Sequence, residues 1–340
     1  MTASGVAEAE FMDEVVGIWD TNNSPLSLGG LLVLSEELKM QALVHQAKSI
    51  AIGIVGDRAG SLLPGQLPQN GEPIVLLSRE ACQGSVLLSL LLDLESINVC
   101  YLCPVLEEFQ KYLQIRSKRH IIWPQVDEQH RINHKYSSTI FIQKFFAERG
   151  FIPQLSCRND LLRWATSFIA QYVTPSLPVV VHLKNNPNLK GCSNANFESW
   201  YNFFLSCYGQ YDVKFILIGN EPIDPQITQL PNVLVARDCG SYLSRDLALI
   251  QTSYIFMGMS SGPCNMALFS GIPYVIYKNP DHDVEEMSSE LGTNIRFPFA
   301  APVQKFLRIF ETSQGLMSEF ADLHAHINRL DWEARLAQWK

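Results

Sequence analysis

The sequence lacks any apolar run long enough to cross a bilayer. Its longest apolar segments are LGGLLVL (28–34) and VLLSLLLDL (86–94), both well short of the roughly 20 residues that a spanning helix needs. The opening MTASGVAEAE has neither the basic nor the apolar stretch of a secretory signal. We therefore expect a cytoplasmic protein, with peripheral contact to a membrane surface left open.

Basic charge is scarce. The chain has 26 Lys and Arg against 34 Asp and Glu, a formal net charge of -8, so we expect no broad basic face for nucleic acid. With 47% hydrophobic and 18% charged residues the composition is typical of a globular protein. At 340 residues the chain exceeds one ordinary core, which favours two domains.

Two nucleotide-binding motifs are missing. GIVGDRAG (53–60) does not have the glycine spacing of G-x-G-x-x-G, and no G-x-x-x-x-G-K-[ST] loop occurs. These absences exclude the usual dinucleotide turn and the ATPase phosphate loop.

A metal centre is not expected either. The eight cysteines are scattered, and the one C-x-x-C, Cys100 and Cys103, lies in NVCYLC (98–103), which is typical of a buried strand. The Asp-His-Asp of 281–283 follows what should be the last strands of a sheet. We interpret the cysteines as free thiols and predict no bound metal and no resident cofactor.

Apolar strand-like runs alternate with helical patterns in the first half. The expected strands are 49–57, 73–78, 98–103 and 117–124, and the expected helices are 30–47, 84–96, 138–150 and 160–173. Because the strands are continuously apolar, they predict a parallel sheet covered on both faces.

The alternation restarts after TPSLP (174–178), a plausible hinge. The expected strands are 179–184, 213–219, 232–236, 254–258 and 273–277, and the expected helices are 196–209, 241–251, the segment after Pro263 and 331–340. We predict an α/β protein with two Rossmann-like domains, 1–173 and 174–320. A terminal segment, 321–340, is predicted to pack back on the first domain.

Polar and basic side chains follow four strands of the second half. Since the carboxyl ends of parallel strands open on one edge of a sheet, these residues should line one site in the cleft between the domains. They are His182, Lys184, Gly219, Glu221, Arg237, Gly258, Ser260, Ser261, Gly262 and Pro263. Their cations, together with a helix N-terminus, predict a site for a diphosphate.

The segment Ser260-Ser261-Gly262-Pro263 has two possible interpretations. Ser261 is suited to an N-cap, Gly262 lets the backbone approach a ligand, and Pro263 fits the first helical position. The segment can equally be an ordinary helix start. His182 can likewise be a satisfied buried histidine, Lys184 a solvated loop residue and Arg237-Asp238 a surface ion pair.

Residues 178–280 resemble the donor-binding domain of GT-B glycosyltransferases of the heptosyltransferase-like group, glycosyltransferase family nine. That family has a loop Asp-Ser-Gly-Pro-x-His-x-Ala followed by Gly-x-Pro and a strand. Here the loop is Ser260 to Ala267 and Gly271-Ile272-Pro273 follows. Ser260 and Asn265 replace the family's Asp and His, which lie near the donor, so donor identity stays open.

The resemblance implies a metal-independent, inverting transfer of a sugar from a nucleotide diphosphate donor. The acceptor would be a glycan, a lipid-linked sugar or another hydroxyl, as in polysaccharide biosynthesis, and Asn265 would join the donor-binding residues. A carboxylate or a His of the first domain would deprotonate the acceptor. Asp57, after AIGIV, is the first candidate for this base and Glu80 the second.

Two other functions remain open from the sequence. A nucleotide-sugar epimerase of the same fold would need several carboxylates in the cleft. A non-catalytic module that binds a nucleotide or sugar would lack a base in the first half. Neither interpretation identifies the sugar, the nucleotide or the acceptor.

Overall fold

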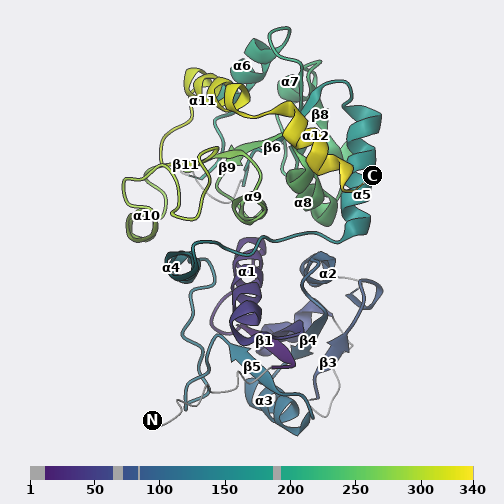
Figure 1. The fold of residues 1–340 in the computed structure, drawn as a ribbon, viewed down its shortest axis with the longest axis vertical. Helices are drawn as coiled ribbons and strands as arrows, with labels where there is room; N and C mark the ends of the chain where they lie inside the picture. Colours follow the sequence, from purple (N-terminus) through teal and green to yellow (C-terminus); the bar gives the residue numbers. More distant parts are fainter. Residues whose placement is uncertain (1–11, 64–71, 83–84, 187–192, 340) are drawn as a thin grey trace, which may run out of the picture. The chain divides into compact units, whose positions relative to one another are not determined.

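The computed structural model describes residues 12–63, 72–82, 85–186 and 193–339. The chain divides into two compact units, Met1–Tyr136 and Ser137–Lys340. Each unit is an α/β layer structure with its own sheet, coloured from purple to blue in the first unit and from teal to yellow in the second (Figure 1).

The first unit is built on a five-stranded sheet in the order β3-β4-β2-β1-β5. The strands are β1 (Glu14–Asp20), β2 (Ser49–Val55), β3 (Ile74–Leu76), β4 (Val99–Cys103) and β5 (His120–Trp123). Four strands are parallel, and β3 runs antiparallel to β4 at one edge. The predicted parallel sheet is therefore confirmed except at this edge, and β1 is a strand that the sequence did not predict.

Helices cover both faces of the first sheet (Figure 1). They are α1 (Leu28–His45), α2 (Val86–Asp93) and α3 (Leu106–Ile115), with short 3₁₀ turns at Asp57–Leu62 and Glu80–Cys82. Two glycines let helices approach the strands closely. A Cβ on Gly17 would lie 2.5 Å from Leu38 of α1, and one on Gly53 would clash with Phe109 of α3. The predicted helices at 30–47 and 84–96 are confirmed.

The second unit has a six-stranded, fully parallel sheet in the order β11-β10-β9-β6-β7-β8. The strands are β6 (Leu177–His182), β7 (Val213–Ile218), β8 (Val233–Val235), β9 (Ile255–Met259), β10 (Tyr274–Tyr277) and β11 (Gln304–Leu307). The five predicted strands are confirmed, and β11 adds a sixth.

The helices of the second unit form layers on both sides of its sheet. They are α4 (Ile140–Arg149), α5 (Asn159–Tyr172), α6 (Phe197–Cys207), α7 (Pro225–Thr228), α8 (Leu243–Thr252), α9 (Cys264–Phe269), α10 (Val284–Glu290), α11 (Ser313–His326) and α12 (Arg329–Ala337). Figure 1 shows α6 beside α11 on one face and α8 beside α9 on the other. An aromatic core of Trp200, Phe203, Phe215 and Phe320 fills the first of these interfaces.

The chain passes between the units earlier than the hinge expected at 174–178. The division falls after Tyr136, so α4 and α5 belong to the second unit. Long-range contacts explain this: α5 packs on α8, Gln251 Oε1 accepts a bond from Cys157 N at 2.9 Å, and Thr139 Oγ1 donates to Glu290 Oε2 at 2.7 Å. Hydropathy patterns along the chain do not reveal such partners.

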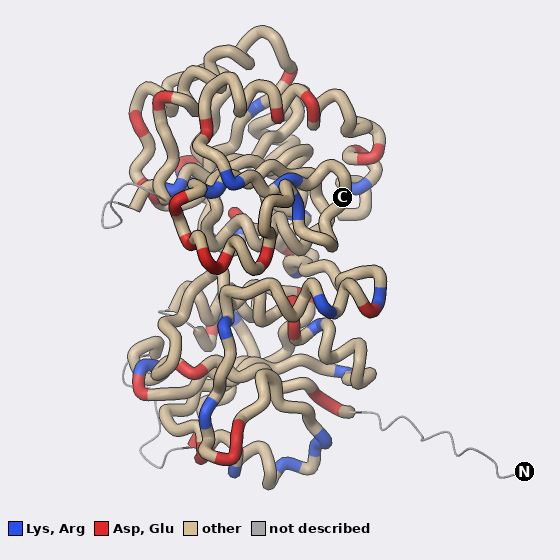
Figure 2. Tube along the Cα trace, turned by 90° about the vertical axis from the view of Figure 1, so that its left-hand side faces the viewer, with Lys and Arg blue, Asp and Glu red and all other residues tan. Residues whose placement is uncertain are grey.

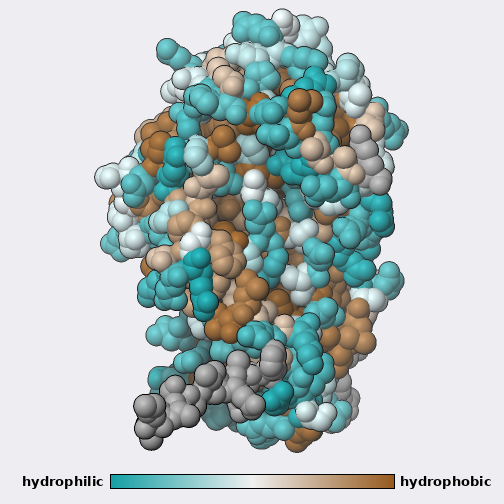
Figure 3. Space-filling model, in the orientation of Figure 1, coloured by the Kyte–Doolittle hydropathy of each residue, from teal (hydrophilic) through white to brown (hydrophobic). Residues whose placement is uncertain are grey.

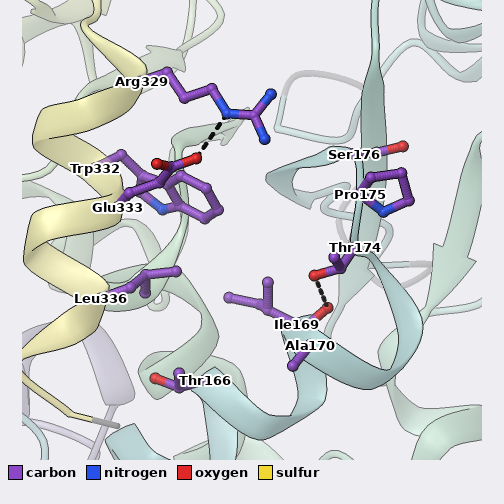
Figure 4. Close-up of a pocket in the computed structure, with 10 residues that line it drawn as sticks. All are labelled: Thr166, Ile169, Ala170, Thr174, Pro175, Ser176, Arg329, Trp332, Glu333 and Leu336. Atoms are coloured by element: carbon purple, nitrogen blue, oxygen red, sulfur yellow. Dashed lines mark hydrogen bonds and ion pairs between the residues drawn. The ribbon is translucent and has the colours of Figure 1, made fainter.

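The C-terminal helix α12 packs within the second unit. Trp332 Nε1 donates to Thr252 O at 3.0 Å, and an Arg335 Nη donates to Ser253 O at 2.6 Å. Between α12 and α5 lies a cavity of about 220 Å³, floored by Ile169, Trp332 and Leu336 (Figure 4). It opens beside Thr174–Ser176, immediately before β6, and therefore at the amino edge of the sheet.

Polar residues dominate the surface. Figure 2 shows Lys and Arg interspersed with Asp and Glu in both units, and in the view of Figure 3 hydrophilic residues cover most of the exterior between smaller apolar patches. Among the described helices, none has the length and hydropathy of a membrane span.

Candidate functional site

The carboxyl edge of the second sheet has a topological switch point between β6 and β9. From β6 the chain proceeds outward through β7 and β8, and from β9 it proceeds in the opposite direction through β10 and β11. At such a point the two following loops diverge and leave a crevice where α/β proteins bind ligands. The predicted residues at the ends of β6 and β9 lie at this position.

His182 ends β6 and is central to the site. Its side chain is 2% exposed, yet both ring nitrogens have partners. Nε2 lies 3.1 Å from Glu221 Oε1, and Nδ1 lies 2.9 Å from Ser261 Oγ. One imidazole thus connects the loops that follow β7 and β9, which were predicted separately from the sequence.

Glu221 and Gly219 form the β7 side of this arrangement. Burial alone would raise the pKa of Glu221, but the hydrogen bond and charge of His182, with backbone N–H groups, outweigh it and hold that pKa below its ordinary value. Gly219 has φ +95°, and a Cβ there would clash with Glu221 Oε2. Glycine is favoured here chiefly because other residues rarely adopt this left-handed backbone, and its lack of a side chain also leaves room for the carboxylate.

Asp246 of α8 supports this loop and was not predicted. Its buried carboxylate accepts bonds from Gly219 N at 3.0 Å and from Ser241 Oγ at 2.5 Å. Burial raises its pKa despite these bonds. Its position in the amphipathic pattern of α8 gives no sign of the role, because its partner Gly219 is 27 residues away.

The Ser-Ser-Gly-Pro segment lies at the site, but Ser261 does not cap the helix that follows it. Pro263 is the N-cap of the six-residue α9, and no side chain caps the helix. The expected cap at Ser261 is wrong, because its hydroxyl contacts His182 instead. The N–H groups of Cys264 and Asn265 bond to the carbonyls of Ser261 and Gly262 at 3.2 and 3.3 Å. The N–H groups of Cys264 and Asn265 are thus bonded within the segment, and the hydroxyl of Ser261 faces the imidazole of His182.

Lys278 is the principal residue that the sequence reasoning missed. It follows β10, beside Ser260, whose N–H donates to Tyr277 O at 2.7 Å. Its side chain is 7% exposed and donates to Asp283 Oδ2 at 2.6 Å. The signal that could have located it is its position at a strand end, one residue after the predicted strand 273–277.

Two lysines create a positive field at this edge. Lys184 and Lys278 both act on Cys264, His282 and Asp283: they oppose the burial that raises the pKa of Cys264 to about 11, and they help to lower the pKa of His282 and of Asp283. Burial is the larger influence on His282 and also lowers its pKa. These two cations are suited to pair with an anionic ligand.

The remaining predicted residues occupy the margins. Arg237 Nη1 donates to Glu221 O at 3.2 Å and fixes the loop after β7. Gly258 lies opposite His182 in the sheet, where a Cβ would meet His182 O at 2.5 Å. Asn265 is half-buried at the start of α9.

In the first unit, the predicted bases lie on 3₁₀ turns. Asp57 and Glu80 are both exposed. Asp20, which was not predicted, is the last residue of β1 and pairs with Val55 of β2. The strand β1 lies beside β5, and the switch point of this sheet falls between these two strands. Its oxygens accept bonds from Asn22 N at 2.9 Å and Asn23 Nδ2 at 2.7 Å.

Metal-ligand geometry is not found in the described part of the chain. No group of three or more His, Cys, Asp or Glu residues there could hold an ion. The cysteines that the structure describes are free, and Cys100 and Cys103 lie in β4 as predicted.

Comparison with solved structures identifies the architecture. A glycosyl transferase family 9 protein from Veillonella parvula matches with a TM-score of 0.51 at 12% identity, over 95% of this chain and 92% of that one. ADP-heptose LPS heptosyltransferase II of E. coli matches with a TM-score of 0.52 at 12% identity, over 92% and 98%. The chain has the GT-B fold. The site at the switch point belongs to the second of the two Rossmann-like units of this fold.

Sequence comparisons add nothing to this assignment. No family model matches the chain, and no curated protein sequence matches it. The GT-B architecture therefore rests on the three-dimensional likeness and on the two doubly wound sheets.

Proposed function

We propose that the protein is a glycosyltransferase that takes a sugar from a nucleoside diphosphate donor and transfers it to a hydroxyl acceptor on a glycan or lipid-linked sugar. The observation that carries this is the convergence of His182, Ser261, Lys184 and Lys278 at the switch point of the second sheet. The GT-B fold supports the reaction class.

The chemistry follows from this set of groups. Cleavage of a glycosyl–phosphate bond leaves additional negative charge on the diphosphate, and fixed cations and hydroxyl donors stabilise that charge. Lys278, held by Asp283, and Lys184 would supply the cations, and Ser261 a hydrogen bond. No metal is needed in this scheme.

The acceptor base is proposed to come from the carboxyl edge of the first sheet. Asp57 is the exposed candidate, and Asp20 is the carboxylate at the switch point. We expect Asp57→Asn to lower kcat by at least about 100-fold with little change in donor KM, as for loss of a general base. Asp20→Asn is the matched substitution, and a kcat loss only in that variant would assign the base to Asp20 instead.

A panel of nucleotide sugars tests the function. Incubation with ADP-, UDP-, GDP- and CMP-linked sugars, followed by chromatography, should show release of the nucleotide from one donor, faster when a hydroxyl acceptor is present. An isomerised donor without release would instead identify an epimerase.

A non-catalytic binding module is the second candidate. It is favoured by the Asp20 carboxylate, whose oxygens are already bonded within their own loop. Tight binding of a nucleotide without turnover of any donor would support it and contradict the enzyme.

A further inference from the structure

Ser261, His182 and Glu221 form a continuous chain of hydrogen bonds that bears on how the site recognises its ligand. The chain runs from Ser261 Oγ to His182 Nδ1 at 2.9 Å and from His182 Nε2 to Glu221 Oε1 at 3.1 Å. Its outer end, Ser261, is half-buried, while the imidazole is almost fully enclosed.

The carboxylate decides which way the hydrogen bonds point. Ionised Glu221 can only accept, and its pKa is held low, so Nε2 of His182 must carry a proton. In the neutral imidazole, Nδ1 is then unprotonated and can only accept. The single hydroxyl proton of Ser261 is thereby committed to His182, and Ser261 can offer only lone pairs to a ligand.

Protonation of His182 reverses this commitment. With N–H groups on both ring nitrogens, Nδ1 donates to Ser261 Oγ and the hydroxyl proton is released to another acceptor. A phosphate oxygen would be such an acceptor, and a hydrogen bond to a charged oxygen is among the stronger ones.

The charged surroundings can support the imidazolium in this enclosed position. Glu221 faces it from the loop after β7, and Asp246 interacts with it from α8. Arg237 binds the carbonyl of Glu221 rather than the imidazole, and Lys184 lies two residues beyond His182 at the end of β6. On the side of β9, the backbone of Gly258 lies next to His182.

We infer that His182 is a proton-dependent positioning residue: binding of a diphosphate takes up one proton on His182 Nδ1 and thereby turns Ser261 from an acceptor into a donor to a phosphate oxygen. The proton comes from solvent and stays on the imidazole while the ligand is bound. The inference rests on the proposed function, because it assigns a diphosphate to this site. Because the bound form carries the additional proton, affinity for the diphosphate should rise as pH falls.

Calorimetric titration of the full chain with ADP, UDP and GDP tests this. The tightest binder is titrated at intervals from pH 5.5 to 8.5, in pairs of buffers with different ionisation enthalpies. We expect wild-type protein to take up more protons than Ser261→Ala, by up to about one per ligand. Its Kd should be lower than that of Ser261→Ala by about ten-fold or more at pH 5.5 and nearly equal at pH 8.5.

Two further variants test whether His182 takes up a proton on ligand binding or has only a structural role. Ser260→Ala removes the neighbouring hydroxyl and leaves the bond between Ser261 and His182 in place, so it should keep the wild-type pH slope whatever its affinity. Glu221→Gln removes the charge that faces the imidazolium, and should reduce the difference in proton uptake between wild type and Ser261→Ala at a given pH. Titration of the ligand's own phosphate is common to all variants.

The outcomes of these titrations distinguish failure of this inference from failure of the proposed function. Equal pH slopes and proton uptake in wild type and Ser261→Ala, with tight nucleotide binding in both, would overturn the inference and leave the proposed function standing. If none of the three diphosphates binds at any pH, the proposed function is contradicted and the inference falls with it.

Discussion

Lys278 is a buried cation whose partner is a carboxylate of the same loop. Its Nζ lies 2.6 Å from Asp283 Oδ2, and Asp283 has a left-handed backbone with φ 52°. A facing carboxylate offsets the hydration that an enclosed ammonium loses. We interpret Asp283 as the group that holds the ammonium at the strand end and that competes there with a diphosphate.

Two substitutions should therefore act in opposite directions. Lys278→Met keeps the aliphatic chain and removes the charge, and it should weaken binding of a nucleoside diphosphate by about 10- to 150-fold, the equivalent of roughly 1.5–3 kcal/mol. Asp283→Asn removes the competitor and should strengthen binding. Calorimetry on both variants checks this, and weaker binding in Asp283→Asn would contradict the competition.

Glu36 is a second buried ionisable group, in α1 of the first unit. Neither of its carboxylate oxygens has a hydrogen-bond partner among the described residues, and burial raises its pKa well above the ordinary 4.5 in spite of the nearby charge of Lys39. As pH rises past 4.5 the unfolded chain releases this proton before the folded chain does. The group therefore costs stability progressively up to its folded-state pKa, and the cost persists above it.

Glu36→Gln should remove that cost. We expect the free energy of unfolding of the first unit to rise by at least about 1 kcal/mol at pH 8, with a smaller gain at pH 5. Urea denaturation at both pH values measures it. Glu37→Gln is the matched control and should give no gain, because Glu37 Oε2 already faces Trp123 Nε1 at 2.8 Å and His134 Nε2 at 3.0 Å. Destabilisation of Glu36→Gln at pH 8 would refute the assignment.

At the scale of elements, α12 is attached to the amino edge of the second sheet. Thr252 and Ser253, which accept bonds from Trp332 and Arg335, immediately precede β9, whereas the candidate site follows the other ends of the strands. The cavity of Figure 4 lies at the same amino edge. Stability and ligand binding should therefore separate for changes in this helix.

Trp332→Ala should lower the stability of the second unit by about 3–5 kcal/mol, as for a buried aromatic ring. Trp332→Phe, which keeps a ring and loses the bond to Thr252 O, should cost only about 1 kcal/mol. Thermal denaturation gives the comparison. Nucleotide affinity below the melting temperature should be unchanged in both variants, and a large change in Kd would show that α12 is coupled to the site.

Long apolar strands and amphipathic helices were predictable from the sequence, and the missed elements have physical causes. β1 begins with a buried Glu14 whose charge is satisfied by Arg116 at 2.8 Å and Lys118 at 3.3 Å, about a hundred residues away. β11, Gln304–Leu307, is only four residues long, and half of them are polar. Hydropathy patterns cannot recover strands that depend on distant partners or on an existing sheet edge.

The sequence predicted which strand ends contribute to the site, but not the contacts that their side chains make. Parallel strands bring His182, Glu221 and Ser261 together, as predicted. The function of Ser261 could not be inferred locally, because its partner lies 79 residues away. The local motif favoured an N-cap, whereas the tertiary contact gives the hydroxyl another partner.

At the scale of the whole molecule, two doubly wound units have different chemical character at their carboxyl edges. The second presents Lys184, Lys278 and His182 beside the carboxylates of Glu221 and Asp283, and the first presents Asp20 and Asp57 without a lysine among the residues proposed there. This division matches the needs of a transfer reaction, in which one partner is an anionic leaving group and the other a hydroxyl that must lose a proton.

Hydrogen–deuterium exchange of the full chain, with and without a saturating nucleoside diphosphate, tests the central claim most directly. We predict protection of peptides covering 180–186, 217–222, 257–264 and 276–283, which together form the carboxyl edge of the second sheet. Protection confined to the amino edge, around 166–176 and 329–336, or no protection anywhere by ADP, UDP or GDP, would contradict the account.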